Sequence, residues 1–336
     1  MKDQRPIRLD HLRALGGRRG LFEHARYTRP RLEHGYCLDD NGRALVLVCR
    51  AESCHIPFPN TLRDRAFEYV MEASSPRVWR NRLSVDEVWE TGASDDAVGR
   101  GMWGLGVAAS WWPEEEGRER ASGRLRHALG FQSRWWHPRA YALLGLTAAV
   151  RASDEPALTE AIARHARHLP RPQRETSWMW PEPRLRYDNA RLPEALIASG
   201  AVLEDSGLVD DGLALLRWLV GKELGQWGFS FAPTGGRGPE DRQPAYDQQP
   251  LEAWAMADAA VRALETTGDA EWLGVARLAA SWFLGANDQG LKIYDNESGG
   301  CFDGLTGDGV NLNQGAESTL SALGALLALR KPVGAP

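Results

Sequence analysis

The sequence contains no long apolar run. No stretch of its 336 residues approaches the roughly 20 apolar residues that a membrane-spanning helix requires. Residues 1–19 are polar and basic, and they lack the apolar segment of a secretory signal peptide. We therefore expect a cytoplasmic protein without a membrane partner.

Cysteine is scarce, and the net charge is slightly negative. The four cysteines, Cys37, Cys49, Cys54 and Cys301, are expected to stay reduced in the cytoplasm. Cys49, Cys54 and His55 lack the second closely spaced pair of a typical zinc site, so we expect neither a metal nor another cofactor. A net charge of −5 does not favour binding to nucleic acid.

Several common catalytic motifs are also missing. The sequence has no Gly-x-Ser-x-Gly nucleophile elbow, no Walker loop, and no Gly-x-Gly-x-x-Gly motif after a predicted strand. These absences argue against an α/β-hydrolase, a P-loop nucleotide hydrolase and a dinucleotide-binding enzyme.

What the sequence does contain is a unit that occurs six times, a polar start followed by a strongly apolar helix. In the clearest copy, Asp188 or Asn189 is a predicted N-cap, and Leu192, Ala195 and Leu196 follow at helical spacing. The other copies begin within residues 39–43, 94–100, 136–139, 246–250 and 313–317. Amphipathic helices separate these units, and a helix before residue 16 is a candidate for the twelfth.

This alternation predicts an all-α fold, the (α/α)6 toroid. Helices that are apolar on every side belong inside, and amphipathic helices belong outside. Six inner helices running in one direction would bring all six polar starts to one end of the molecule. We expect a single toroid domain over residues 1–336, with residues 1–35 as an N-terminal extension that packs on it.

The gathered polar starts predict a site for glycoside hydrolysis, which uses two carboxyl groups on either side of a sugar. Ring closure places the first inner helix between the second and the sixth, so we expect Asp40, Asp96 and Glu317 to be the catalytic residues. Helices pack about 8–10 Å apart, and this spacing favours an inverting mechanism with Asp40 as the base. Glu317 is the preferred acid, and Asp96 is the alternative.

Substrate binding is assigned to polar and aromatic residues around the same rim. Tryptophan is unusually abundant, with fourteen residues, and its ring can stack on a sugar face as well as fill a core. The predicted substrate-binding residues are Asp39, Asn41, Arg100, Trp135, Trp136, His137, Trp180, Tyr187, Asp188, Asn189, Asp247, Gln248 and Gln314.

Simpler interpretations remain open for each residue. An Asp before a helix is often only an N-cap, and a Trp is more often part of the core. One alternative function is a non-catalytic glycan-binding module that serves a glycosyltransferase. Another is a sugar epimerase on the same toroid, which would need paired histidines at the inner rim, where the sequence offers only His137.

Several segments resemble a bacterial all-helical family whose members occur alone or joined to glycosyltransferases. The resemblance runs from about residue 20 to 330, and its clearest segments are 20–25, 35–45, 178–196, 247–250, 299–305 and 313–319. This family belongs with the six-hairpin glycosidase-like toroids, which implies a carbohydrate substrate and names a glycosyltransferase as a candidate partner. The chain departs from the family pattern at Gly42, where alanine is expected, and at Val98, which replaces a histidine.

Overall fold

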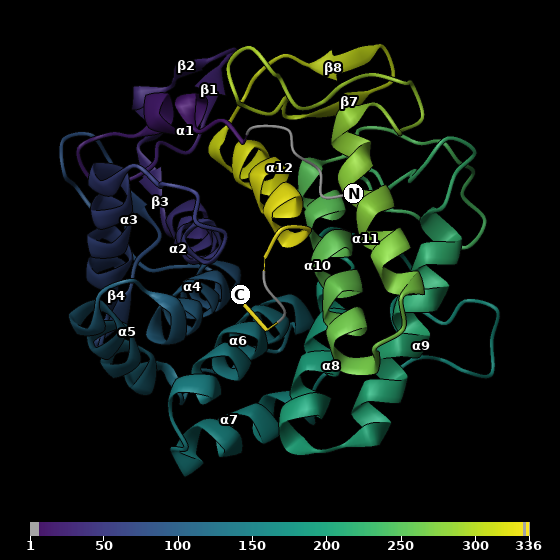
Figure 1. The fold of residues 1–336 in the computed structure, drawn as a ribbon, viewed down its shortest axis with the longest axis horizontal. Helices are drawn as coiled ribbons and strands as arrows, with labels where there is room; N and C mark the ends of the chain where they lie inside the picture. The colour runs from purple at the N-terminus through teal and green to yellow at the C-terminus, as the bar shows by residue number, and fades with distance from the viewer. Residues whose placement is uncertain (1–6, 332–333, 336) are drawn as a thin grey trace.

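The computed structural model describes residues 7–331 and 334–335, and within them twelve α-helices form two concentric rings (Figure 1). Each inner helix contacts the next, and the last contacts the first, so the inner ring is closed. The inner helices are α2 (Leu38–Ser53), α4 (Asp95–Trp111), α6 (Trp136–Ala149), α8 (Arg191–Leu203), α10 (Pro250–Thr267) and α12 (Ala316–Ala328).

The outer ring follows the inner one along the chain. It consists of α3 (Asn60–Ala73), α5 (Glu115–Ala128), α7 (Pro156–Ala166), α9 (Ser206–Glu223) and α11 (Glu271–Ser281), and α1 (Asp10–Leu15) packs on α12 as the sixth member. Three short 3-10 helices are η1 (Leu32–His34), η2 (Val150–Ala152) and η3 (Trp282–Leu284). The predicted (α/α)6 toroid is confirmed.

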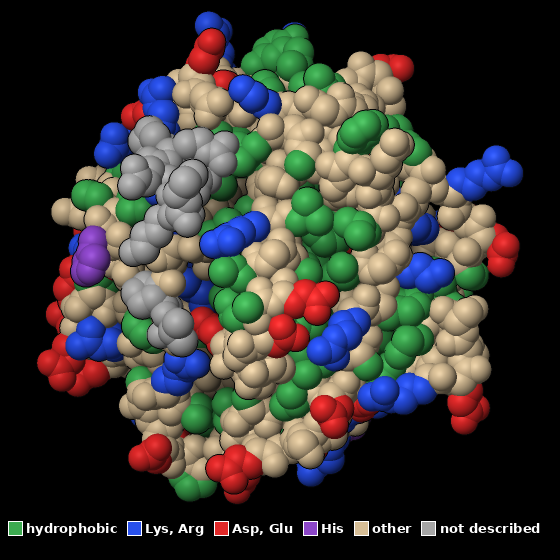
Figure 2. Space-filling model, turned by 45° about the vertical axis from the view of Figure 1, so that its right-hand side comes forward, with side chains coloured by type: hydrophobic (Ala, Val, Ile, Leu, Met, Phe, Trp, Pro, Cys, Tyr) green, Lys and Arg blue, Asp and Glu red, His purple; other side chains and the backbone are tan. Residues whose placement is uncertain are grey.

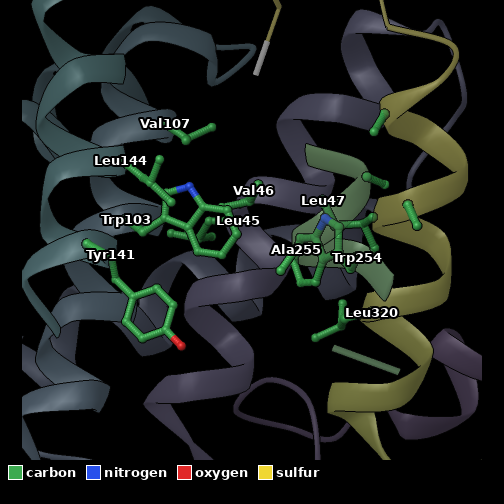
Figure 3. Packing of buried hydrophobic residues seen from close by; sticks show 14 of the residues in the cluster. Leu45, Val46, Leu47, Trp103, Val107, Tyr141, Leu144, Trp254, Ala255 and Leu320 are labelled. Carbon is green, nitrogen blue, oxygen red and sulfur yellow. The ribbon is translucent and has the colours of Figure 1, made fainter. Parts of the chain in front are cut away.

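The centre of the ring is filled by side chains. Trp103 of α4 and Trp254 of α10 approach each other with ring centroids 5.4 Å apart, among aliphatic residues of the other inner helices (Figure 3). The guanidinium of Arg191 lies over both rings, 4.6 Å from the first centroid and 5.0 Å from the second. Asp258 accepts hydrogen bonds from Arg50 at 2.9 Å and from Arg191 at 2.8 Å, so these buried charges compensate one another.

The helices α2, α4 and α6 pack with their backbones unusually close. A Cβ on Gly104 would lie 2.5 Å from the carbonyl oxygen of Gly42, and a Cβ on Gly106 would lie 2.0 Å from that of Gly145. A Cβ on Gly42 would in turn lie 2.8 Å from the carbonyl oxygen of Arg100. The glycine that departs from the family pattern is therefore required by the close approach of α4 to α2.

Four short antiparallel strand pairs connect the helices. They are β1 (Ala25–Arg26) with β2 (Arg29–Pro30), β3 (Tyr36–Cys37) with β6 (Arg82–Leu83), β4 (Ser74–Ser75) with β5 (Val78–Trp79), and β7 (Gly304–Thr306) with β8 (Gly309–Asn311). The β1–β2 hairpin is joined to the segment before α12, because the Tyr27 amide donates to Asn313 Oδ1 at 2.9 Å and the Gln314 amide donates to the Tyr27 carbonyl at 2.9 Å.

Several predicted N-caps prove to be something else. Ser94 is a true cap, since its hydroxyl accepts from the Ala97 amide at 3.2 Å. Asp40 lies inside the first turn of α2, after Cys37 at the N-cap position, and α8 begins after Ala190 without a side-chain cap. Asp188 precedes α8 with a φ of 51°, because contacts with neighbouring helices hold its backbone there.

The outer surface carries mixed charge. The face turned forward in Figure 2 shows acidic and basic side chains interspersed with small groups of apolar ones. In the described part of the chain, no helix combines the length and the apolar character needed to cross a bilayer.

Candidate active site

A cavity of about 450 Å³ opens where the inner helices begin. We call it the acid cavity. Its lining residues come mainly from the first turns of α2, α4 and α12 and from the segments around residues 23 and 303, and they are Glu23, His24, Cys37, Asp39, Asp40, Arg43, Ser94, Asp96, Arg100, Gln249, Asp303, Asn311, Gly315, Glu317 and Ser318. The structure therefore brings the three predicted catalytic carboxyl groups into one cavity, together with Asp39 and Arg100.

Two of these carboxyl groups lie on either side of one guanidinium. Arg43 Nη1 donates to Asp40 Oδ1 at 2.9 Å, and Arg43 Nη2 lies 2.7 Å from Glu317 Oε2. The Asp40 side chain is only 4% exposed, whereas that of Glu317 is 39% exposed. One arginine thus connects a buried carboxyl group with an accessible one.

Burial gives Asp40 an unusual affinity for protons. Desolvation raises its pKa to about 7, although Arg43 opposes this shift and the nearby Glu317 adds to it. The Cys37 thiol donates to Asp40 Oδ2 at 3.1 Å and favours the charged form. Asp39 is half-buried, which raises its pKa, but Arg100 and Arg43 outweigh this desolvation and hold the pKa of Asp39 below its usual value.

Arg100 organises the other side of the cavity. Its Nη1 donates to Asp39 Oδ1 at 2.7 Å and lies 3.8 Å from Asp96 Oδ2. Its Nη2 donates to the Tyr141 hydroxyl at 2.9 Å, and that hydroxyl donates to Asp188 Oδ2 at 2.6 Å. The buried Asp188 does not line the cavity. It is linked to Arg100 by hydrogen bonds through the Tyr141 hydroxyl and helps to hold Arg100 in place.

A second pocket of about 680 Å³ adjoins the acid cavity, and the two share Ser94 and Asp96. We call it the tryptophan pocket. Its lining residues are Ser94, Asp95, Asp96, Arg134, Trp135, Trp136, His137, Glu182, Arg186 and Tyr187. Four predicted substrate-binding residues, Trp135, Trp136, His137 and Tyr187, thus lie together, and the Tyr187 hydroxyl donates to Asp96.

His137 is held as a neutral ring in this pocket. It stacks between Trp136 and Tyr187, with centroid distances of 3.4 and 4.1 Å, and its Nε2 lies 2.7 Å from the Tyr187 carbonyl oxygen. Burial lowers the pKa of His137 to about 3. Trp135 is 54% exposed, and the Arg134 guanidinium lies 4.4 Å from the centre of its ring.

Other predicted binding residues lie elsewhere. Trp180 is fully buried and packs at the edge of Trp136, so its ring is part of the hydrophobic core. Asp247 is exposed, but it lines neither the acid cavity nor the tryptophan pocket. The structure brings neither residue to the two cavities, and their roles in substrate binding stay predictions.

Four buried Asn and Gln side chains form hydrogen bonds within the protein. Asn41 Oδ1 accepts from the Leu21 amide at 2.9 Å, and Asn189 Oδ1 accepts from the Arg186 amide at 2.9 Å. Gln248 donates to Asp288 at 2.7 Å, and Gln314 donates to Asp295 at 3.0 Å. Asn41, Asn189, Gln248 and Gln314 are thus engaged by buried backbone and side-chain groups, and their binding to sugar hydroxyls stays a prediction.

The predictions from sequence included five of the residues that line the acid cavity and omitted the others, among them Glu23, His24 and Asp303. Glu23 and His24 come from the segment before α2, and Asp303 comes from the segment before β7. Burial raises the pKa of Asp303, whose Oδ1 accepts from the Gly315 amide at 2.7 Å. Their only signal was their position in segments that resemble the family, since no helical periodicity places them.

Glu252 was also missed, although it is part of the support beneath the site. It is buried in the first turn of α10 and accepts hydrogen bonds from the backbone amides of Asp188 and Asn189. Burial raises the pKa of Glu252 well above its usual value, and Glu223 and Asp188 add to this effect. Within residues 7–331 and 334–335, no group of three or more His, Cys, Asp or Glu side chains is arranged to hold a metal ion.

Comparison with solved structures shows where else this architecture occurs. The cellobiose 2-epimerase from Bacillus thermoamylovorans B4167 superposes with a TM-score of 0.70 at 13% identity, over 96% of this chain and 95% of that one. A D-mannose isomerase gives a TM-score of 0.67 at 11% identity, over 95% of both chains. The GH76 alpha-mannanase of Bacteroides thetaiotaomicron gives 0.65 at 12% identity, over 88% of this chain and 86% of that one.

At these identities the likeness concerns the fold. No protein-family model matches the chain, and no curated protein matches it either. The toroid architecture expected from the family resemblance is therefore confirmed, and membership in that particular family stays a prediction.

Proposed function

We propose that the protein is a glycoside hydrolase that cleaves an oligosaccharide or polysaccharide in the acid cavity. The observation that carries the proposal is the pair Asp40 and Glu317, which share Arg43 but differ in burial and accessibility. Glycoside hydrolysis needs one carboxyl group that holds a proton and one that is ionised. Structural neighbours that include an alpha-mannanase, a cellulase and sugar epimerases support a carbohydrate substrate.

In this proposal the roles of the two residues are the reverse of those expected from sequence. Asp40 is the acid, because burial keeps its proton near neutral pH. Glu317 is the base, because its exposed carboxylate can activate a water molecule that enters the cavity. Asp96 lies at the border between the acid cavity and the tryptophan pocket, where it can accept a hydrogen bond from a sugar hydroxyl.

The tryptophan pocket supplies the binding surface beside the reacting bond. Trp135 and Tyr187 present aromatic rings there, and sugar rings bury their apolar faces against such rings. Because this pocket shares Asp96 with the acid cavity, a sugar bound there has its neighbour at the carboxyl pair.

The test is a panel of oligosaccharides and polysaccharides incubated with the protein, followed by analysis of the products. We expect cleavage of one glycan class, and a loss of about 100-fold or more in rate for Glu317→Gln with its fold intact. Glu271→Gln, on the exposed outer helix α11, is the matched control and should keep full activity. Binding without cleavage across the panel would instead favour the non-catalytic module that serves a glycosyltransferase.

A sugar epimerase or isomerase is a second candidate, and one contact favours it. His24 lines the acid cavity, and its Nδ1 lies 3.0 Å from His34 Nδ1, so a pair of histidines lies at the cavity wall. The same panel separates the two functions, since epimerisation changes the configuration of a free sugar without releasing a fragment. In that case His24→Ala should abolish the activity and Glu317→Gln should reduce it less.

A further inference from the structure

The acid cavity continues into a third pocket on the side away from Trp135. This pocket measures about 1120 Å³ and shares Asn311 with the acid cavity. We call it the arginine pocket. One wall is the segment around the β1–β2 hairpin and the other is the segment after β7, and the lining residues are Arg26, Tyr27, Thr28, Arg29, Pro30, Arg31, Glu33, Val310, Asn311, Leu312 and Asn313.

Two arginines in this pocket face each other without a counter-charge. Arg26 of β1 and Arg29 of β2 are directly opposed in the hairpin register, and both are exposed. Like charges in this relation destabilise a strand pair. Among the described residues neither has an acidic partner within ion-pair distance, whereas the adjacent Arg31 donates to Glu33 at 2.9 Å. An anion between Arg26 and Arg29 would relieve the repulsion.

An aromatic ring stands beside these two charges on a fixed backbone. Tyr27 is 56% exposed and has a φ of 54°, a conformation that is uncommon for a residue with a side chain. Its amide and carbonyl both form hydrogen bonds with the segment before α12, through Asn313 Oδ1 and the Gln314 amide. The two walls of the pocket are therefore tied together, and the ring is held where it can stack on a sugar.

We propose that the arginine pocket binds a sugar unit that carries an acidic group, either a carboxylate or a sulfate. Arg26 and Arg29 bind the anion, and Tyr27 stacks on the ring. The carboxylates of the acid cavity repel anions, so the unit bound there is neutral and the acidic unit lies beyond it. The placement of the polysaccharide across both cavities rests on the proposed function. The substrate class that follows is an acidic heteropolysaccharide.

Binding is measured separately from cleavage, by titration calorimetry on the full chain carrying Glu317→Gln. The probes are a hyaluronan hexasaccharide, whose only acidic groups are carboxylates, and a chondroitin sulfate hexasaccharide, which carries carboxylates and sulfates. Cellohexaose and mannohexaose are the neutral controls. The double variant R26A/R29A removes the two opposed charges. The matched control R242A/R277A removes two exposed arginines for which no acidic partner is found among the described residues, and neither lines the pocket.

We expect at least one acidic probe to bind, and R26A/R29A to weaken that binding about 10-fold or more. R242A/R277A should leave the affinity unchanged, and thermal melting should show both double variants to be folded. Binding of hyaluronan points to the carboxylate, which both probes carry, and binding of chondroitin sulfate alone points to the sulfate. Equal weakening by both double variants, tighter binding of the neutral probes, or no binding of either acidic probe would overturn the proposal.

The outcomes also separate this proposal from the hydrolase assignment. Arginine-dependent binding of an acidic probe that the wild-type protein does not cleave would leave the pocket assigned and count against hydrolysis of that probe. Cleavage of neutral glycans at a rate that R26A/R29A does not change would support the hydrolase and overturn the acidic subsite.

Discussion

The Arg43 guanidinium lies 2.7 Å from the Glu317 carboxylate, and this ion pair joins the first inner helix to the last. Because Arg43 and Glu317 are 274 positions apart in the chain (317 − 43), this contact forms only when the ring closes. The same contact that completes the fold thus sets the position of the accessible carboxylate over the buried one.

The pH dependence of activity should follow Asp40. As an acid it must be protonated, so the rate should fall as the pH rises through about 7. Cys37→Ala removes a hydrogen bond that favours the charged form of Asp40, so it should raise the pKa of Asp40 and move the fall in rate to higher pH. Cys37→Ser provides a stronger donor and should move the fall in rate to lower pH. The same pH dependence in all three proteins would argue against Asp40 as the acid.

Protein stability should show the same titration. The pKa of Asp40 is raised above its unfolded value of 3.8, so its stabilising effect is full below pH 3.8 and is lost as the pH rises through about 7. Asp40→Asn cannot ionise and should therefore gain stability relative to the wild type across this interval. Urea unfolding at pH 4 and pH 8 measures the difference, which should be larger at pH 8.

The product of hydrolysis should have inverted configuration at the cleaved carbon. Arg43 lies between Asp40 and Glu317 and keeps the two carboxyl groups out of direct contact, which suits attack by an intervening water molecule. Proton NMR of the first product, recorded before the anomers equilibrate, distinguishes the two results. A retained configuration would instead require one carboxylate to attack the sugar directly.

Trp135 should contribute to substrate affinity. Trp135→Ala is expected to raise KM about fivefold to tenfold with little change in kcat, because stacking acts on substrate and transition state alike. Trp227 is the matched control, since it is also exposed, at 67%, but lines neither the acid cavity nor the tryptophan pocket. Equal effects of both alanine substitutions would remove the case for a stacking role.

The parts of the site that sequence predicted are those set by helical periodicity. Asp40, Asp96 and Glu317 lie within the first turns of inner helices, so the ring topology alone brings them together. Glu23 and Asp303 reach the cavity through loops, whose paths depend on tertiary contacts that leave no periodic pattern.

The sequence does not place residues whose type serves two purposes. Trp180 was assigned to sugar binding, but an indole ring fills a core equally well, and burial decides between the two only in the folded chain. Asn189 was assigned to substrate for its amide, but the amide oxygen accepts from the Arg186 backbone N–H and the amide nitrogen donates to Glu252. The type of such a residue tells which interactions its side chain can form, but not whether it forms them with the substrate or with the rest of the protein.

The buried charge cluster at the centre of the ring should be essential for stability. Asp258→Asn leaves Arg50 and Arg191 without their shared carboxylate, so we expect a loss of about 3–5 kcal/mol in the free energy of unfolding. Glu68→Gln, which breaks an exposed ion pair with Arg120, should cost less than about 1 kcal/mol. Urea denaturation of the three proteins provides the comparison.

The glycine contacts make an equally direct prediction. Gly106→Ala would place a Cβ 2.0 Å from the Gly145 carbonyl oxygen and should destabilise the protein by about 3 kcal/mol or more. Gly123→Ala in α5 meets no atom within 4 Å and should stabilise it by about 0.5–1 kcal/mol. Melting temperatures that change in the same direction for both variants would contradict this account of the packing.

The glycine-mediated packing of α2, α4 and α6 also bears on how this site can evolve. Contacts between backbones offer no side chain to exchange, so substitutions in this half of the ring are restricted, and Asp39, Asp40, Asp96 and Arg100 are carried by it. Asp303, Asn311 and the β1–β2 hairpin belong instead to the connections between the helices, and such connections tolerate exchange. If the proposed function holds, descendants of this sequence would acquire new specificities through these connections while inheriting the same acidic centre.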